Sequence, residues 1–299
     1  MKSGFVAIVG KPNSGKSTLI NKLIDNKISI VSDKAQTTRN SIIGVYNKKD
    51  LQIVFVDTPG IHNPKTSLGS YMNKVSYNEA NGCDVIYYLS DVSKGLDKDD
   101  KEILDKLFNY DIPIFLILNK IDLVKKNLII ERLAYATSNY KFAEYIPLSA
   151  LKNDNIDELI NTTVSYLKEG PKYYPDDFKN NLSTNQVISE IIRERLLKNL
   201  DKEVPHLMAV SIDNYKEDNK KAIIEASIIV NKESHKGIVL GKGGSMLNKV
   251  NVEATTELEK KLGLKVVLSL FVKVDEDWIN NEKKMFELGY FIEKNDWKY

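Results

Sequence analysis

The chain has 299 residues, which is enough for about two domains. Hydrophobic residues make up 42% and charged residues 28% of the sequence, and these fractions exclude a disordered chain. The formal net charge of +2 excludes bulk charge as the means of binding a polyanion, so any such site must be a local patch.

Short aliphatic runs alternate with helical patterns in the first half of the chain. The runs are apolar on both faces, as the strands of a parallel sheet are. Residues 41–58 read as two strands joined by a lysine-rich turn, which adds one antiparallel strand. The alternation predicts an α/β fold with a doubly wound, mostly parallel sheet. The predicted parallel strands lie at residues 4–10, 51–58, 84–91, 113–120 and 143–150, with helices between them, for example at 67–80 and 98–110.

This pattern breaks at residues 168–178, where two prolines, a glycine and three acidic residues interrupt the periodicity. We therefore expect a first domain over residues 1–168, a linker over residues 169–182 and a second domain over residues 183–299.

The second half has α+β order rather than βαβ repetition. It begins with an amphipathic helix that stops near Pro205. Two strands, a short helix, a glycine loop, a helix to about Leu262 and a final strand follow. The strands are expected at residues 206–215, 221–232 and 264–274, and the apolar face of the first helix consists of Ile188, Ile191, Ile192, Leu196 and Leu200.

The stretch GKPNSGKST follows the first predicted strand and opens a helix. Its two glycines, separated by four residues and followed by Lys and Ser, match the phosphate-loop pattern. Backbone amides and the helix N-terminus would face the phosphates, Lys16 would reach the β- and γ-phosphates, and Ser17 would ligate Mg²⁺. The alternative is a plain turn between a strand and a helix. The predicted phosphate-binding residues are Gly10, Lys11, Pro12, Asn13, Ser14, Gly15, Lys16, Ser17 and Thr18.

The stretch NKID, at the end of the fourth parallel strand, distinguishes guanine from adenine. Asp122 can accept hydrogen bonds from guanine N1–H and from its exocyclic amine, which adenine does not offer in that geometry. Asn119 would bridge the base and the phosphate loop, and the stem of Lys120 can lie along the base. At the end of the next strand, Ser149 and Ala150 complete the predicted guanine site, with the Ala150 amide aimed at guanine O6.

Two further loops have the composition of nucleotide switches. Asp57, at the end of a strand, is placed to hold Mg²⁺ through water, and the Gly60 amide can sense a γ-phosphate. One threonine of the loop before residue 41 should bind both Mg²⁺ and the γ-phosphate; we favour Thr38, with Thr37 as the alternative. The predicted first switch contains Gln36, Thr37, Thr38 and Arg39, and the second contains Asp57, Thr58, Pro59, Gly60 and Ile61.

Together, GKPNSGKST, QTTR, DTPGIH, NKID and SA resemble the Era family of bacterial GTPases. This resemblance implies a P-loop GTPase domain that alternates between GTP and GDP states, with GTP or GDP and Mg²⁺ as ligands. Ras-like enzymes place a glutamine after the DTPG-type motif to orient water, whereas this chain has Ile61. Related GTPases use an asparagine at the position of Asn13 to hold K⁺. We therefore hypothesise K⁺ acceleration through Asn13; the alternative is that Asn13 only stabilises the turn.

The second glycine loop, GKGG at residues 241–244, lacks the spacing of a nucleotide phosphate loop. A turn of the form GxxG between two helices, beside three strands, resembles a type II KH module, which clamps the backbone of single-stranded nucleic acid. The alternative is a glycine cap joining two helices. Residues 232–249 carry four lysines and one glutamate, a local net charge of +3. The predicted RNA-binding residues are Lys236, Gly237, Ile238, Val239, Leu240, Gly241, Lys242, Gly243, Gly244 and Lys249.

Resemblance to the Era family extends over almost the whole chain. It implies binding of small-subunit (16S) ribosomal RNA near its 3′ end and a role in assembly of the 30S subunit. The alternative is an RNA-binding adaptor or chaperone in which GTP is mainly structural. A membrane-surface signalling GTPase is a third reading, which the absence of a basic amphipathic helix disfavours.

The sequence also bears on the location and assembly of the protein. The single cysteine, Cys83, excludes an intramolecular disulfide framework and suits a reducing cytoplasm. It begins an apolar run, so we expect a buried thiol rather than a nucleophile. No apolar run approaches the roughly 20 residues that span a bilayer. We expect a cytoplasmic monomer and leave open a peripheral association with the inner face of the cell membrane.

Overall fold

The computed structural model describes residues 1–32, 34, 37–178, 180–201 and 204–291. Contacts within the chain define two compact units. The first unit comprises Met1–Pro64 and Met72–Asn181, and the second comprises Lys65–Tyr71 and Leu182–Tyr299.

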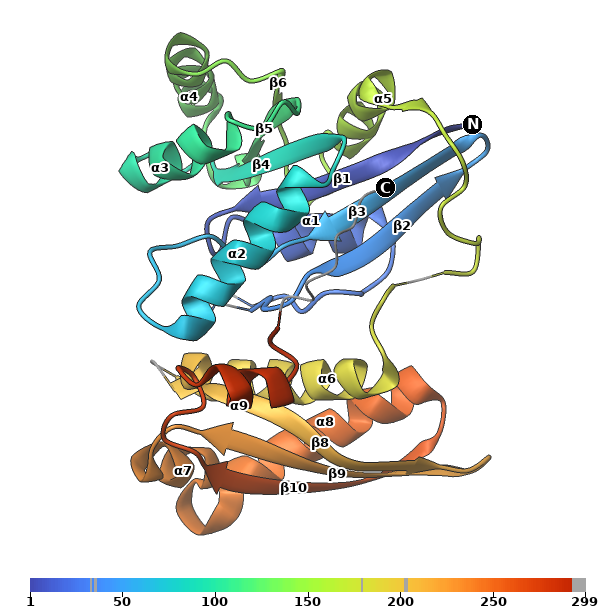
Figure 1. Ribbon diagram of the computed structural model, residues 1–299, viewed down its shortest axis with the longest axis vertical. Helices are drawn as coiled ribbons and strands as arrows, with labels where there is room; N and C mark the ends of the chain where they lie inside the picture. The colour runs from blue at the N-terminus through green and yellow to red at the C-terminus, as the bar shows by residue number, and fades with distance from the viewer. Residues whose placement is uncertain (33, 35–36, 179, 202–203, 292–299) are drawn as a thin grey trace. The chain divides into compact units, whose positions relative to one another are not determined.

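The first unit is built on a seven-stranded sheet (Figure 1). Six strands follow the order β2-β3-β1-β4-β5-β6, and β7 pairs with β1. Neighbours from β3 to β6 are parallel, whereas β2 is antiparallel to β3, as the lysine-rich turn predicts. The strands are β1 (Lys2–Gly10), β2 (Ile42–Lys48), β3 (Leu51–Asp57), β4 (Val85–Asp91), β5 (Ile114–Asn119), β6 (Glu144–Pro147) and β7 (Lys168–Glu169).

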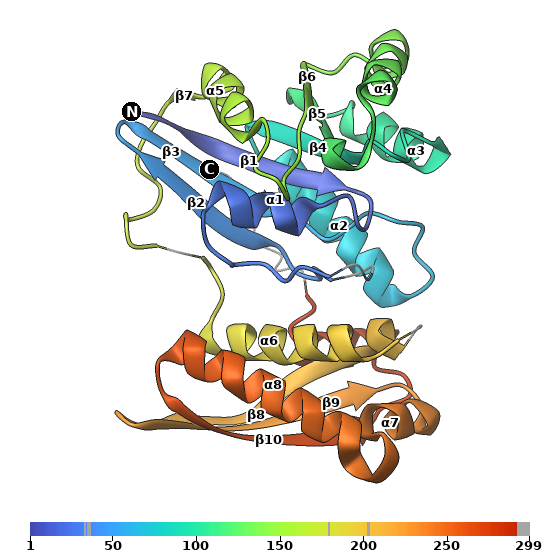
Figure 2. The same cartoon turned by 180° about the vertical axis from the view of Figure 1, so that it is seen from behind.

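Helices cover both faces of this sheet, so the predicted doubly wound α/β fold is confirmed. Helices α1 and α5 lie on one face, and α2, α3 and α4 lie on the other (Figures 1 and 2). The helices are α1 (Lys16–Leu23), α2 (Ser67–Asn81), α3 (Lys98–Leu107), α4 (Lys126–Asn139) and α5 (Ile156–Tyr166), with a 3₁₀ turn η1 at Ile121–Leu123.

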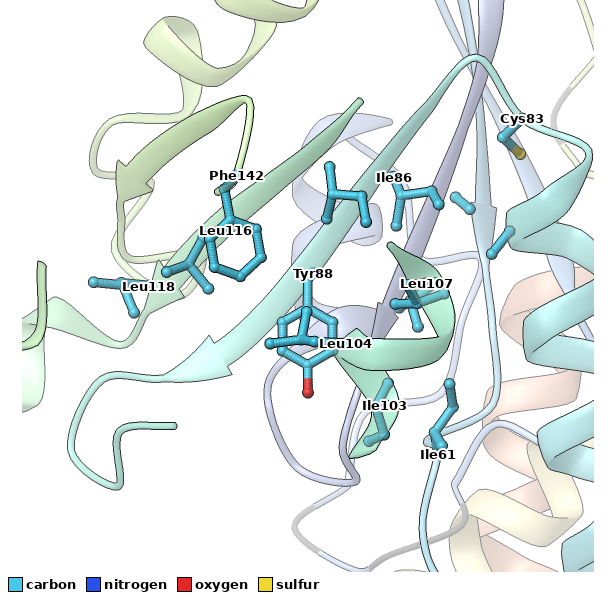
Figure 3. Packing of buried hydrophobic residues seen from close by; sticks show 14 of the residues in the cluster. Ile61, Cys83, Ile86, Tyr88, Ile103, Leu104, Leu107, Leu116, Leu118 and Phe142 are labelled. Carbon is cyan, nitrogen blue, oxygen red and sulfur yellow. The ribbon is translucent and has the colours of Figure 1, made fainter. Parts of the chain in front are cut away.

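Apolar residues of strands β3, β1, β4 and β5 form a continuous core with the second group of helices. Tyr88 of β4 belongs to the same buried cluster as Leu104 and Leu107 of α3, part of which Figure 3 shows. Cys83 lies at its margin, where its thiol contacts the Glu79 carbonyl at 3.2 Å and burial raises the pKa of the thiol well above its ordinary value. The expectation of a buried thiol is confirmed.

Part of the segment predicted as a linker packs on the first unit. The buried side chain of Gln52, on β3, accepts hydrogen bonds from the Tyr173 and Tyr174 amides at 2.8 and 3.0 Å. Its amide nitrogen donates to the Tyr174 carbonyl at 2.8 Å. Farther along, Asn181 Oδ1 accepts a bond from the Ile43 amide of β2 at 2.9 Å. The buried side-chain amide of Gln52 thus holds the chain that leaves the first unit, while the linker boundaries themselves stay a prediction.

The second unit contains a three-stranded sheet of order β10-β9-β8, in which β10 is parallel and β8 antiparallel to β9. Helices α6 and α8 pack on one face of it. The expected apolar face of α6 is buried, because Ile188, Ile192 and Leu196 have no exposed surface. The elements are α6 (Thr184–Asn199), η2 (Val204–Leu207), β8 (Met208–Glu217), β9 (Lys221–Val230), α7 (Glu233–Leu240), η3 (Lys242–Gly244), α8 (Ser245–Leu262), β10 (Lys265–Val274) and α9 (Glu282–Glu287).

Helix α6 begins at a capping box formed by Ser183 and Gln186. It ends at Asn199, earlier than the stop expected near Pro205, because Leu200 already has an extended backbone. Among the described residues, no helix combines the length and the apolar character that crossing a membrane requires.

Candidate nucleotide and nucleic-acid sites

The loop between β1 and α1 wraps tightly because two glycines have no room for a side chain. A Cβ on Gly10 would lie 2.4 Å from the Leu89 carbonyl oxygen, and one on Gly15 would lie 2.2 Å from Asn119 Nδ2. Gly15 also has a φ of 101°, which disfavours any L side chain. The loop therefore opens directly into the N-terminus of α1, where backbone amides can face an anion.

Lys16, the first residue of α1, is 6% exposed. Its ammonium group donates to the carbonyls of Gly10 and Lys11 at 3.0 and 2.9 Å. Burial lowers its pKa to about 8, despite the opposing attraction of Asp57. Among the described residues, the hydrogen-bond acceptors of this buried ammonium group are neutral carbonyls. The group can therefore form a strong, charge-assisted hydrogen bond with an anion such as a phosphate oxygen.

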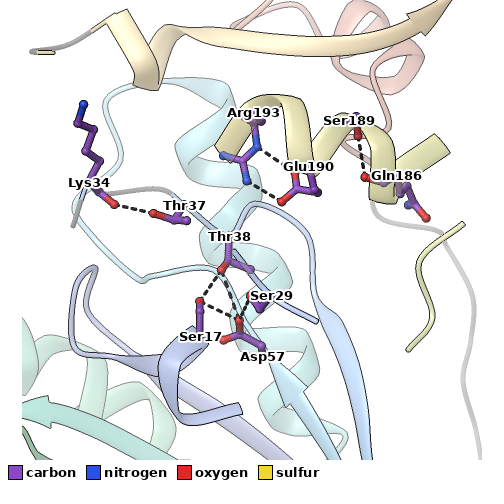
Figure 4. Close-up of polar contacts among 10 residues, drawn as sticks. All are labelled: Ser17, Ser29, Lys34, Thr37, Thr38, Asp57, Gln186, Ser189, Glu190 and Arg193. Carbon is purple, nitrogen blue, oxygen red and sulfur yellow. Dashed lines mark hydrogen bonds and ion pairs between the residues drawn. The ribbon is translucent and has the colours of Figure 1, made fainter. Parts of the chain in front are cut away.

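Four side-chain oxygens, from Ser17, Ser29, Thr38 and Asp57, converge at one place (Figure 4). Asp57 Oδ2 accepts hydrogen bonds from Ser17, Ser29 and Thr38 at 3.0, 2.7 and 3.4 Å, and Ser17 lies 2.9 Å from Thr38. Burial raises the pKa of Asp57, and these donors oppose that shift. Asp57 Oδ1 is buried without a hydrogen-bond partner in the described part of the chain. Hydroxyl and carboxylate oxygens suit a hard divalent cation such as Mg²⁺.

The two threonines of the first switch point to different places. Thr38 reaches Asp57, whereas Thr37 Oγ1 donates to the Lys34 carbonyl at 2.6 Å (Figure 4). The structure thus groups Thr38, rather than Thr37, with the other oxygens. Arg39 is buried, and Gln36 lies outside the described residues.

The second switch segment lies against the phosphate loop. A Cβ on Gly60 would come within 2.9 Å of Pro12, and the Ile61 amide donates to the Gly10 carbonyl at 3.2 Å. Thr58 is anchored by a bond from its hydroxyl to the Ile8 carbonyl at 2.8 Å, and the Pro59 carbonyl accepts a bond from Ser76 at 2.8 Å. The side chain of Ile61 is buried, so it offers no polar group to water.

The predicted guanine residues come together around Asn119. Its Nδ2 donates to the Ser14 carbonyl at 2.9 Å, and its Oδ1 accepts from the Ala150 amide at 3.0 Å. Asn119 thereby joins the phosphate loop to the loop after β6. The Ala150 amide, expected to reach guanine O6, is engaged with this oxygen.

Two neighbouring side chains complete this edge of the sheet. Lys120 donates to the Asn13 carbonyl and to Asp91 Oδ2, both at 2.8 Å. Asp122 is exposed and accepts a hydrogen bond from the Ser149 hydroxyl, which orients its carboxylate. An oriented, exposed carboxylate beside the phosphate loop can accept the two donors that guanine presents.

Sequence reasoning missed several polar partners of the site. Lys11 forms ion pairs with Asp97 and Asp100 at 2.6 and 2.7 Å. Although burial opposes its charged form, hydrogen bonds to these two carboxylates raise the pKa of Lys11. Asp91 and Ser29 were missed as well. All four partners lie far along the chain from the motif residues that they contact. Only Ser29 stood out locally, as a polar residue between two isoleucines in the sequence.

The GKGG loop has a different character. Gly241, Gly243 and Gly244 have φ values of 71°, 61° and 82°, all in the left-handed region. Apart from neighbours along the chain, no atom of the described residues lies within 4 Å of a Cβ built on Gly243 or Gly244. Lys242 and Lys249 are exposed, so positive charge and open backbone coincide at one turn.

One residue of the predicted RNA-binding set does not face this surface. Val239 has no exposed surface and belongs to the apolar core of the second unit, so its prediction as a base contact was wrong. Ile238 is 48% exposed and Leu240 is partly buried. Consecutive residues of α7 point about 100° apart, so three in a row cannot all line one groove.

Comparison with known families assigns both units. Residues 5–120 match the family described as 50S ribosome-binding GTPase, and residues 203–279 match the KH domain family. The fold is therefore a P-loop GTPase followed by a KH domain, as expected.

Two relatives identify the family of P-loop GTPases to which the chain belongs. GTPase Era of Staphylococcus haemolyticus is 46% identical over 296 residues, which cover 99% of each chain. GTPase Era of Clostridium kluyveri is 47% identical over 291 residues, covering 97% of this chain and 99% of the relative. The chain belongs to the Era family and is a GTPase.

Two solved structures agree with this assignment. An Aquifex aeolicus Era variant bound to GDP·AlF4⁻ has a TM-score of 0.94 and 37% identity, covering 98% of this chain and all of the relative. An Era structure in complex with MgGDPNP and nucleotides 1506–1542 of 16S ribosomal RNA has a TM-score of 0.94 and 38% identity, with the same coverage.

Proposed function

We propose that this GTPase is a nucleotide switch whose KH domain binds small-subunit ribosomal RNA near its 3′ end during 30S assembly. The observation that carries the RNA part is the exposed GKGG turn, where two glycines open onto free space between exposed lysines. Glycine is needed where a nucleic-acid backbone approaches the protein backbone closely. A relative of the same fold binds a 16S fragment, which favours the small subunit although the matching GTPase family is described by the 50S subunit.

For the nucleotide site, we assign phosphate binding to residues 10–18 and guanine recognition to Asn119, Lys120, Asp122, Ser149 and Ala150. Mg²⁺ would be held by Ser17 and Thr38 directly and by Asp57 through water. Its chemistry, when bound, is to neutralise charge on the phosphates. Lys16 and the loop amides would stabilise the charge that develops as the γ-phosphate leaves. The Gly60 amide would sense the γ-phosphate.

Water positioning in this site cannot use Ile61, whose side chain is buried and apolar. We propose that K⁺ bound through Asn13 accelerates hydrolysis. Asn13 is exposed at the turn of the phosphate loop with a φ of 64°, and Lys120 fixes its carbonyl. Replacing Na⁺ with K⁺ should raise the hydrolysis rate about tenfold in the wild type and have little effect in Asn13→Ala. Equal rates in the two salts would rule this role out.

Domain organisation follows the same proposal: a GTPase domain at 1–168, a linker at 169–182 and an RNA-binding domain at 183–299. The γ-phosphate would order both switch segments and so shift the population of domain arrangements. We also propose a cytoplasmic monomer. Liposome flotation would test a peripheral membrane association, and sedimentation equilibrium would test the monomeric state.

Coupling between the bound nucleotide and RNA affinity can be tested by fluorescence anisotropy with a short single-stranded RNA from the 3′ end of 16S ribosomal RNA. The protein is loaded with GDP or with a non-hydrolysable GTP analogue. We expect tighter binding with the analogue. Equal binding in both states would favour the adaptor alternative, and no binding in either would remove the RNA assignment.

A matched pair of variants makes this test specific to the turn. Asp and Asn both tolerate the left-handed backbone of Gly243, but only Asp adds negative charge. We expect Gly243→Asp to abolish RNA binding and Gly243→Asn to weaken it less, with GTP hydrolysis unchanged in both. Equal loss in the two variants would mean that space, not charge, decides binding there.

A further inference from the structure

Asn21, on α1, fastens the chain that leads into the first switch. Its Oδ1 accepts hydrogen bonds from the amides of Ile28 and Ser29, both at 2.9 Å. Its Nδ2 donates to the Ser29 carbonyl at 2.8 Å. Three bonds from one side chain fix the backbone at Ser29, and the buried side chains of Ile28 and Ile30 hold it from either side.

Ser29 is thereby presented to the carboxylate of Asp57. Its hydroxyl, in a residue that is 2% exposed, donates to Asp57 Oδ2 at 2.7 Å (Figure 4). This is the shortest of the three bonds that Oδ2 accepts. A hydroxyl bond to an ionised carboxylate is strong and directional, so it restricts rotation of the carboxylate.

The other two donors differ from Ser29 in one respect. Ser17 and Thr38 are assigned above as direct ligands of Mg²⁺, so their oxygens would turn to the cation when it binds. Ser29 is held by Asn21 and has no such second task. It is the donor that can keep Asp57 in place in both states of the site.

We propose that Ser29, held by Asn21, is a positioning residue that orients Asp57 and so sets how tightly Mg²⁺ is retained with bound nucleotide. This inference rests on the proposed role of Asp57 in Mg²⁺ binding. Loss of a side chain that orients a ligand typically weakens metal affinity by about 10- to 100-fold. Asp57 itself acts through water, so we expect the lower end of that range.

The test measures release of fluorescent mant-GDP from the full-length protein across Mg²⁺ concentrations, with EDTA as the metal-free reference. Ser29→Ala should raise the Mg²⁺ concentration that half-maximally slows release by about tenfold, and Asn21→Ala should shift it in the same direction. Release in EDTA should stay as in the wild type. Ser29→Thr, which keeps the hydroxyl, should restore the wild-type Mg²⁺ dependence.

Two reference variants distinguish failure of the inference about Ser29 from failure of the proposed Mg²⁺ site. Ser32→Ala removes a hydroxyl from the same loop that accepts a bond from the Lys34 amide at 3.2 Å, and it should behave as the wild type. Asp57→Asn should shift the Mg²⁺ dependence strongly. If Asp57→Asn shifts it and Ser29→Ala does not, the inference is wrong while the proposed Mg²⁺ site stands.

Two other outcomes also overturn the inference. If Asp57→Asn has no effect, the proposed Mg²⁺ role of Asp57 fails and the role of Ser29 fails with it. If Ser29→Ala accelerates release equally in Mg²⁺ and in EDTA, Ser29 supports the nucleotide pocket rather than the metal. A melting temperature for each variant confirms that the protein is folded.

Discussion

The two glycine loops of this protein use glycine for opposite reasons. In the phosphate loop, a side chain on Gly10 or Gly15 would collide with the protein itself, at 2.4 and 2.2 Å. In the GKGG turn, a Cβ on Gly243 or Gly244 would meet no atom within 4 Å in the part of the chain that the structure describes, neighbours along the chain aside. In the first loop, neighbouring segments of the protein occupy the space that a side chain would need, whereas in the second loop no described neighbour does so.

The lysines of the two loops differ in the same way. Lys16 is 6% exposed and bonded to carbonyls of its own loop, while Lys242 is exposed. A buried cation with fixed geometry can stabilise charge that develops at one point. An exposed one contributes a screened attraction to a polyanion. The first loop therefore suits catalysis on a small ligand, and the second suits modest, salt-sensitive binding.

The largest effect should come from Lys16→Ala. Removing one preorganised donor from a transition state typically costs 10²- to 10³-fold in rate. We expect GTP hydrolysis to fall about 10³-fold, with RNA binding retained in the GDP-loaded protein. Single-turnover hydrolysis and anisotropy measure the two properties. A fall of less than tenfold would mean that the buried position of Lys16 has no catalytic consequence.

The next effect concerns stability and compares Gly10→Ala with Gly243→Ala. Overpacking against the Leu89 carbonyl should cost about 3 kcal/mol in the first unit. Gly243→Ala meets no described atom beyond its chain neighbours and should cost about 1 kcal/mol, the strain of a left-handed backbone. Trp278 is fully buried in the second unit, so tryptophan fluorescence in urea reports that unit, while release of bound mant-GDP reports the first.

The contrast between the loops would be lost under either of two results. One is an equal loss of stability in the two variants. The other is a Gly10→Ala protein whose urea midpoint for mant-GDP release matches that of the wild type. The second result would mean that the main chain around Leu89 yields easily, so that Gly10 is required for the ligand only.

Features that depend on short motifs and on their order along the chain could be predicted from the sequence, because those patterns are local. The order of strands and helices, the antiparallel β2 and the grouping of Asn119 with Ala150 all follow from spacing along the chain. Thr38 and Thr37 are adjacent and chemically alike, so the sequence could only favour one of them. Their hydrogen-bond partners differ only in the folded loop, which directs Thr38 to Asp57 and Thr37 to the Lys34 carbonyl.

Contacts that depend on tertiary register were not predictable. Gln52 reads as one more strand residue, yet it holds a segment more than 120 positions away. Val239 is a different case, because the period of a helix already excludes three consecutive residues from one groove. Only the choice of the residue that enters the core required the structure.

The smallest effect should come from Lys242→Gln in the open turn. If Lys242 contacts one phosphate of single-stranded RNA, its removal should lower the magnitude of the slope of log K against log salt by about 0.7. Affinity should fall only a few-fold at moderate salt, equally for matched RNAs of different sequence, because a phosphate contact reads no base. Lys265→Gln, on the exposed start of β10, is the control and should leave the slope unchanged. A sequence-dependent loss in Lys242→Gln would instead assign this lysine to base recognition, and an unchanged slope would place the RNA backbone away from the GKGG turn.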